Sequence, residues 1–204
     1  MASPICLDGV PFPLHSGEAS WHLAGQTLHG SAGPNTDLFV DPGTAGSVNA
    51  ETLLNAPRAI GATPPGDFQF MARVDADLNA QFDAGVLLLW VDDDRWAKFC
   101  FELSPDAEAM VVSVVNRGVC DDANGFVVDG RHVWLRIARV GKAFAFHAST
   151  DGGQWSLVRV FSLGQIDDLK VGFAVQSPTG QGCSADFSEV RFASETLTNL
   201  RDGS

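Results

Sequence analysis

The segment Ala84–Leu103, AGVLLLWVDDDRWAKFCFEL, decides the fold class that we predict for this chain. Two short apolar runs, Ala84–Val91 and Trp96–Leu103, lie on either side of three consecutive aspartates, which are typical of a turn. Neither run shows the spacing of apolar residues that an amphipathic helix requires. The segment therefore predicts two neighbouring β-strands.

The rest of the chain repeats this pattern of short apolar runs separated by turn-forming residues such as Asn124-Gly125. Short helical turns are expected only at Ala50–Ala59 and Gly164–Leu169. Many short strands without intervening helices predict an all-β fold, a sandwich of two antiparallel sheets. The further strands are predicted at Trp21–Gly30, Asp37–Val40, Phe68–Val74, Met110–Arg117, His132–Val140, Ala143–Ser149, Ser156–Leu163, Lys170–Gln176 and Ala185–Phe192.

Length and charge restrict the possible functions. The 204 residues are expected to form a single domain, residues 1–204, with a core at about 18–194 and short tails. The chain has 13 Lys and Arg against 25 Asp and Glu, a formal net charge of −12, and no local cluster of basic residues. Nucleic-acid binding is therefore not expected, because it needs a basic surface. No apolar run approaches the roughly 20 residues that span a bilayer, so no membrane association is expected either.

The four cysteines, at positions 6, 100, 120 and 183, are irregularly spaced and follow no zinc-binding pattern. The first residues, Met1–Gly9, show neither the basic region nor the long apolar run of a secretory signal. These observations predict reduced thiols in a cytoplasmic protein, some of them buried. We expect no cofactor and no metal site.

The strand Trp96–Leu103 separates its side chains into two faces of different character. Ala97, Phe99, Phe101 and Leu103 share one face, whereas Trp96, Lys98, Cys100 and Glu102 share the other. An aromatic ring, a cation and a carboxylate on one face are unusual for a plain solvent-facing surface. Similar mixed faces are predicted on other strands by Trp134 with Arg136, by His147 and by Gln176. We hypothesise that these side chains line one shallow groove.

Four segments resemble the sequence patterns of a known family. The segment Gln81–Glu102 is similar to its pattern YDxAGLxxxxDxxxWxKxxxE, and Trp134–Arg139 with Ser149–Trp155 is similar to WLRxxRxG…SxDGxxW. Val171–Phe192 resembles its closing VGxxxxSPxGxG…F…F strands, and Ala32–Pro42 resembles GTDFWxDP. The family has no known function and includes the regulation-of-enolase protein. Its members resemble concanavalin A-like jelly rolls, so the resemblance implies a jelly-roll sandwich.

The chain departs from the family pattern at two places. It contains no Tyr, and Phe82 stands at the first aromatic position. The sequence Arg117-Gly-Val-Cys120 replaces the usual NGYSDW-like loop. If that loop contacts a ligand, the specificity of this chain differs from that of its relatives.

The mixed faces suggest a binding module for a carbohydrate or a similarly polyhydroxylated metabolite. Sugar rings pack their C–H faces on aromatic side chains, and their hydroxyls need planar polar partners. The candidate ligand-binding residues are Trp96, Lys98, Glu102, Arg117, Trp134, Arg136, His147 and Gln176. The alternative is structural: the Trp residues are buried anchors, and Lys98 pairs with a carboxylate of a neighbouring strand. Lys98 and Glu102 lie roughly 13 Å apart along their strand, so each needs a different partner.

Two other functions stay open. A glycoside hydrolase needs two carboxyl groups about 5–9.5 Å apart. Cys100 and Ser104 flank Glu102 on its own face, so the strand lacks the second carboxylate, although Asp186 on another strand is a possible partner. We therefore predict no catalytic residues. The family resemblance also implies a metabolic regulatory protein that acts through a protein partner.

Acidic loops offer weak signals for a metal. The segment from Asp75 begins like an EF-hand loop, but Ala80 and Val86 stand where that loop needs Gly and Glu. The aspartates at 92–94 are interpreted as a solvated turn. The segment Ser149–Trp155 resembles the Asp-box hairpin of sialidases, which we interpret as a structural turn with a packed Trp.

Overall fold

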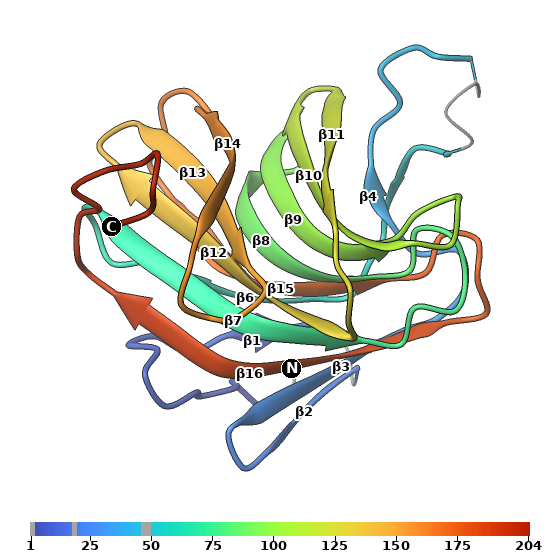
Figure 1. Ribbon diagram of the computed structural model, residues 1–204, viewed down its shortest axis with the longest axis horizontal. Coiled ribbons are helices and arrows are strands. Elements are labelled where there is room, and N and C mark those ends of the chain that lie inside the picture. Colours follow the sequence, from blue (N-terminus) through green and yellow to red (C-terminus); the bar gives the residue numbers. More distant parts are fainter. Residues whose placement is uncertain (1–2, 18–19, 46–49) are drawn as a thin grey trace.

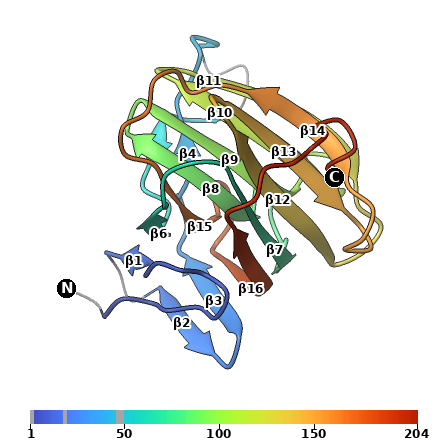
Figure 2. The ribbon, with the colours of Figure 1, turned by 90° about the vertical axis from the view of Figure 1, so that its left-hand side faces the viewer.

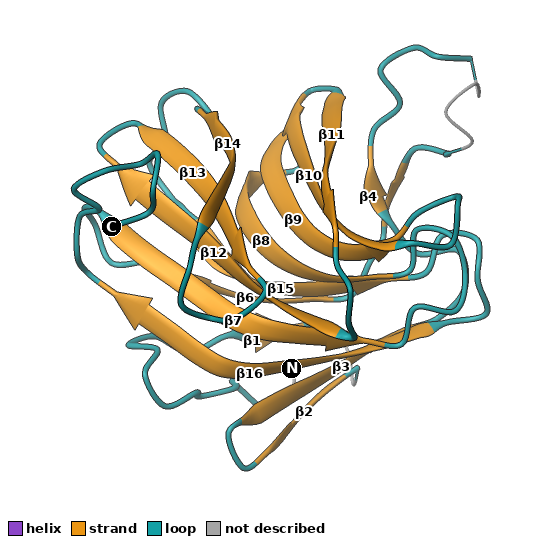
Figure 3. Ribbon diagram, viewed as in Figure 1, coloured by secondary structure: helices purple, strands orange, loops and turns teal. Residues whose placement is uncertain are grey.

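The computed structural model describes residues 3–17, 20–45 and 50–204, and within these ranges it contains strands, turns and loops but no helix (Figures 1 and 3). The expected sandwich of two antiparallel sheets is confirmed. No described helix is long and apolar enough to cross a membrane.

The first sheet has seven strands, which all pair antiparallel. In spatial order they are β1 (His15–Ser16), β6 (Arg58–Ala62), β15 (Lys170–Gln176), β8 (Ala84–Asp92), β9 (Arg95–Leu103), β10 (Ala109–Arg117) and β11 (Cys120–Val127).

The second sheet also has seven antiparallel strands. In spatial order they are β14 (Ser156–Phe161), β13 (Ala143–Ser149), β12 (His132–Val140), β7 (Phe68–Ala76), β16 (Cys183–Ala193), β3 (Thr27–Ala32) and β2 (Trp21–Ala24). Figure 2 shows β1, β2 and β3 together at one end of the molecule. A separate short pair joins β4 (Leu38–Phe39) to β5 (Leu53–Leu54).

The main core lies between the two sheets and contains the inward-facing side chains of both. Phe99 of β9 stacks on Phe146 of β13 with ring centroids 4.6 Å apart, and Phe70 of β7 meets Phe173 of β15 at 5.3 Å. These rings are fully buried, as the alternation of strand side chains requires. Consequently Lys98 and Glu102 on β9, one position out of phase with Phe99, point away from the core.

Two glycines of the family patterns permit close contacts within this sandwich. A Cβ atom at Gly85 would lie 2.7 Å from Val74 Cγ1 on the opposite sheet. A Cβ atom at Gly172 would overlap the carbonyl oxygen of Ala59 on the neighbouring strand. Both positions need the smallest side chain, so these parts of the patterns serve the fold.

Three local predictions were wrong. The range 50–59 holds strands β5 and the start of β6 instead of a helical turn, and 164–169 contains only bends. Asn124-Gly125 lies inside β11 instead of forming a turn, because the register between Met110 and Val112 shifts there and leaves a bulge. The edge strand β11 was not predicted because its sequence is mostly polar.

Each sheet carries a covering segment on its outer face. The first, which we call the strap (residues 36–45 and 50–56), covers the β8–β11 part of the first sheet. Its Thr36 pairs with Ser177 after β15, and its Val40 accepts a hydrogen bond from the Cys120 amide at the start of β11. The second, which we call the tail (residues 197–204), covers β12 and β13 of the second sheet. Figure 1 shows the tail and the strap at opposite sides of the molecule.

Candidate functional site

A buried ion pair lies between the strap and the first sheet. Nζ of Lys98, on β9, donates a hydrogen bond to the carboxylate of Asp37, on the strap, at 2.8 Å. Burial works to lower the pKa of Lys98, but the charge and hydrogen bond of Asp37, together with the acidic groups of Cys100 and Glu102, outweigh burial and raise that pKa above its ordinary value. The ammonium group is therefore charged at neutral pH, and the strap provides its counter-charge.

A second acceptor completes the environment of Lys98. Its Nζ donates to Oε1 of Gln176 at 2.9 Å, and Nε2 of Gln176 donates to the carbonyl oxygen of Phe82 at 3.0 Å. Phe82 has a positive φ of 68°, an unusual conformation for a bulky residue. This strained turn holds the Gln176 amide in one orientation, and the amide in turn holds the ammonium group.

Glu102 is the acidic member of the site. Its side chain is only 7% exposed, and burial raises its pKa to about 8, although Lys98 works in the opposite direction. The Cys100 thiol lies on the same face of β9 as this carboxyl group. Glu102 is therefore a neutral carboxylic acid at pH 7, able to donate one hydrogen bond and to accept others.

Glu102 lies in a small cavity, which we call the Glu102 pocket, of about 90 Å³. Its lining combines charged and amide side chains with apolar ones. The lining residues that matter here are Asp37, Phe39, Phe82, Lys98, Glu102, Met110, Asp122, Asn124 and Gln176. A wider hollow of about 530 Å³ adjoins it and shares Asp37 and Ala50 with it. The small Glu102 pocket therefore adjoins a larger space on the side of Asp37 and Ala50.

Arg136 and His147 do not join this pocket. The structure places them on β12 and β13, with Leu135 and Phe146 facing the core beside them. They consequently lie on the outer face of the second sheet, and the whole sandwich separates them from Lys98. The expected single groove was wrong, because side-chain alternation assigns residues to a face of their own strand only, not to a sheet.

The other predicted site residues also have separate locations. Trp96 is fully buried under the strap, stacked on Trp90 at 6.3 Å, with its indole nitrogen donating to the Asp93 carbonyl. Arg117 is exposed at the end of β10 and donates to the Ser162 carbonyl. Trp134 is half-buried on the second sheet and donates to Glu189. Of the eight predicted ligand-binding residues, only Lys98, Glu102 and Gln176 line the Glu102 pocket.

The sequence patterns missed several lining residues. Asp37 belongs to the GTDFWxDP-like segment, so its presence could have suggested a role, but not its contact with Lys98, 61 positions away. Asp122 and Asn124 were missed because β11 was not recognised as a strand. The register pairs Asp122 with Val114 and Asn124 with Val112, which puts both on the face of Glu102.

The cysteines are free thiols. Burial raises the pKa of Cys100 well above its ordinary value, and that of Cys120 to about 11. The protonated forms are poor nucleophiles, which argues against cysteine chemistry at this site. The described residues contain no group of three or more His, Cys, Asp or Glu that could hold a metal ion.

A family model described as "Protein of unknown function (DUF1349)" matches residues 16–195. The chain belongs to this family. No curated protein sequence matches it significantly. The family therefore provides a fold and a set of motifs without an assigned activity.

Solved structures share the fold of this DUF1349 protein. A functionally unknown protein from Saccharomyces cerevisiae is 22% identical, with a TM-score of 0.75, and the match covers 90% of this chain and 96% of that one. The GH43 protein BlXynB from Bacillus licheniformis is 14% identical (TM-score 0.68), and the match covers 90% of this chain but only 37% of BlXynB. The carbohydrate binding module CBM66 from Bacillus subtilis is 12% identical (TM-score 0.56; 93% and 99% covered). At these identities the likeness shows the fold alone.

Proposed function

We propose that this protein is a non-catalytic binding module that holds a carbohydrate or another polyhydroxylated small molecule in the Glu102 pocket. One observation carries the proposal: a buried carboxyl group with a pKa of about 8 lies in a small cavity that polar and apolar side chains line together. Perturbed groups of this kind cluster at functional sites.

The chemistry of the pocket suits hydroxyl groups. The neutral Glu102 acid donates and accepts, the Asn124 amide does both, and the Asp122 carboxylate accepts. Phe82 and Phe39 supply ring faces for C–H groups. The Glu102 pocket has room for one hydroxylated edge of a sugar ring, and the adjoining hollow of about 530 Å³ has room for the rest of an oligosaccharide.

Proteins of similar fold support a saccharide ligand. CBM66 is named as a carbohydrate binding module, and other structural matches are a xylan beta-1,4-xylosidase and a GH43 protein of a xyloglucan locus. This chain spans only 37% of the length of those two proteins. We therefore infer only a ligand class from this likeness, and we do not transfer the enzymatic activities of those proteins to this chain.

The strand register favours binding over glycoside hydrolysis. Glu102 pairs with Met110, whereas Asp122 pairs with Val114, which itself pairs with Lys98. Two strand spacings and four residues separate Glu102 from Asp122, so their Cα atoms lie about 16 Å apart. The carboxyl groups of glycosidases are at most about 9.5 Å apart, a separation that these two side chains would approach only if both extended fully toward one another along the sheet. Asp37, the other acidic residue of the pocket, is engaged by Lys98.

Calorimetric titration of the full chain with xylotriose, arabinotriose and a xyloglucan oligosaccharide tests the proposal. We expect at least one of them to bind with a dissociation constant in the millimolar range or tighter. Glu102→Gln should retain binding, because an amide also donates and accepts, whereas Glu102→Leu should weaken it at least tenfold. Glu108→Gln, at an exposed position in the following turn, is the matched control and should bind as the wild type does.

Three results would replace the proposal. Unchanged binding by Glu102→Leu would place the ligand elsewhere. Release of shorter sugars by the wild type but not by Glu102→Gln would identify a hydrolase. No saccharide binding, together with a stoichiometric protein partner, would favour the regulatory function that the regulation-of-enolase resemblance implies.

A further inference from the structure

Arg136, on the outer face of the second sheet, is a buried cation without a counter-charge. Its side chain is 5% exposed, and no carboxylate of the described residues lies within ion-pair distance of it. Burial lowers its pKa to about 10, so it is still charged at neutral pH. The guanidinium group lies over the Trp155 ring, 4.2 Å from its centroid. A buried charge in this condition is costly unless an anion accompanies it.

One of the three guanidinium nitrogens of Arg136 has no hydrogen-bond acceptor. Nη1 donates to Gln69 at 3.3 Å, and Nη2 donates to the carbonyl oxygen of Gly203, in the tail, at 2.7 Å. Nε is buried and has no hydrogen-bond partner. Because the guanidinium is planar, the N–H groups of Nε and Nη2 point in parallel along the same edge. Nη2 therefore has an acceptor in the tail, whereas the neighbouring Nε donor has none among the described residues.

His147 repeats this incomplete arrangement beside Arg136. Its side chain is fully buried, and its Nε2 lies 2.9 Å from the carbonyl oxygen of Leu200, also in the tail. Burial lowers the pKa of His147, so the ring is neutral, and Nε2 must carry the proton that the carbonyl accepts. Nδ1 is then a bare acceptor, and it is buried without a donor.

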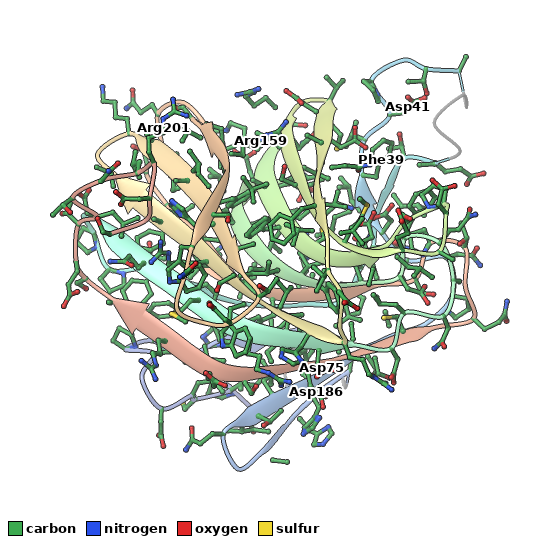
Figure 4. All side chains as sticks on the ribbon, in the orientation of Figure 1. Phe39, Asp41, Asp75, Arg159, Asp186 and Arg201 are labelled. Atoms are coloured by element: carbon green, nitrogen blue, oxygen red, sulfur yellow. The ribbon has the colours of Figure 1, made fainter. Side chains whose placement is uncertain are left out.

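The close approach of the tail to Arg136 requires a glycine at position 203. Gly203 has a φ of +76°, and a Cβ atom there would overlap Arg136 Nη2 and lie 3.1 Å from Trp155 Cβ. The carboxylate of the tail, on Asp202, hydrogen-bonds Asn199 and Ser204 within the tail. Figure 4 shows Arg201 on this same loop, above the second sheet. Only a main-chain segment without a side chain can approach the guanidinium in this way.

We propose that Arg136, His147 and Trp155 form a second binding site, for a small hydroxylated carboxylate such as a sugar acid, which the tail covers. A carboxylate in place of the Gly203 carbonyl would accept from both Nε and Nη2 and would neutralise the buried charge. A hydroxyl group of the same molecule would donate to Nδ1 of His147. The ligand thus satisfies each buried polar atom that the tail leaves without a partner.

Displacement of the tail gives a direct test on the full chain. Gly203→Val should release residues 197–204, seen as faster amide hydrogen exchange, and should tighten D-glucuronate binding at least tenfold, because the site is no longer occupied. The matched control is Gly164→Val: Gly164 has a φ of +77°, and a Cβ atom there would have no other atom within 4 Å. It should bind D-glucuronate as the wild type does. D-glucose, which lacks the carboxylate, should bind at least tenfold more weakly than D-glucuronate to Gly203→Val.

The double variant Gly203→Val with Arg136→Lys retains the charge but loses the two-donor edge, and should lose at least tenfold in D-glucuronate affinity. Equal affinity for glucose and glucuronate, or an unchanged affinity in the double variant, would overturn the proposal. So would a released tail without tighter glucuronate binding, or a tail that stays protected in Gly203→Val. Saccharide binding at the Glu102 pocket should be the same in all these variants, so the two sites can fail independently.

Discussion

Each outer face of the sandwich has a buried cation, and the two cations differ in the group that the covering segment provides to them. On the first sheet the strap supplies the carboxylate of Asp37 to Lys98 at 2.8 Å, with Gln176 as a second acceptor. On the second sheet the tail supplies only the main-chain carbonyl of Gly203 to Arg136. Both covering segments bury a charge, but only the strap compensates it.

The same difference appears in the apolar packing of the two covering segments. The strap also places Leu38 and Phe39 in a second apolar cluster with Trp96 and Val112. The tail contributes a single buried apolar anchor, Leu197. We therefore expect the strap to unfold with the whole molecule and the tail to open separately. On the face under the strap, Asp37 pairs with Lys98, and Glu102 is the group whose pKa is raised by burial.

The largest expected effect is on the ion pair under the strap. Asp37→Ala should lower the free energy of unfolding by about 3–5 kcal/mol, because it leaves the Lys98 ammonium buried without a counter-charge. The double variant Asp37→Leu with Lys98→Met should recover most of that loss, since both charges are gone. Urea denaturation measures all three proteins. A loss of less than about 1 kcal/mol in Asp37→Ala would show that the pair is not a structural element.

The second effect is a pH dependence produced by Glu102. In the unfolded chain this carboxyl loses its proton near its ordinary pKa of 4.5, whereas in the folded protein it retains the proton up to about 8. Its contribution to stability is thus fully present below pH 4.5 and is lost as the pH rises to 8. Relative to Glu102→Gln, the wild type should lose about 1.4 kcal/mol per pH unit in this range. Parallel stability curves of the two proteins would contradict the raised pKa.

A smaller effect is expected on the face without a counter-charge. Arg136→Met should cost about 1–2 kcal/mol, through lost hydrogen bonds and packing on Trp155, because no carboxylate is left unpaired behind it. The same urea measurement gives the comparison with Asp37→Ala. If Arg136→Met costs as much as Asp37→Ala, the contrast between the two faces is wrong.

The smallest global effect should come from the tail. Gly203→Ala should change the free energy of unfolding by less than about 1 kcal/mol, close to the effect of Gly164→Ala, since opening of the tail is local. Hydrogen exchange should nevertheless be faster in residues 197–204 of the first variant alone. A global loss of several kcal/mol would make the tail part of the core.

Much of the strand pattern could be predicted from the sequence. The alternation in Trp96–Leu103 correctly put Lys98 and Glu102 on one face and Phe99 and Phe101 on the other. Strand β11 was missed because CDDANGFV lacks apolar alternation and contains a bulge at Asn124-Gly125. An exposed edge strand needs few apolar residues, so its sequence resembles a loop.

By itself, the sequence determined that the chain forms short alternating strands, which side chains share a strand face, and that Lys98 and Glu102 need separate partners. Only the tertiary structure decided that Asp37 is the partner of Lys98, and that Arg136 and His147 belong to the opposite face. The physical reason is the range of the interactions. Alternation is a local property of an extended backbone, whereas the assignment of strands to sheets and the placement of the strap and tail depend on pairing between residues far apart in the chain.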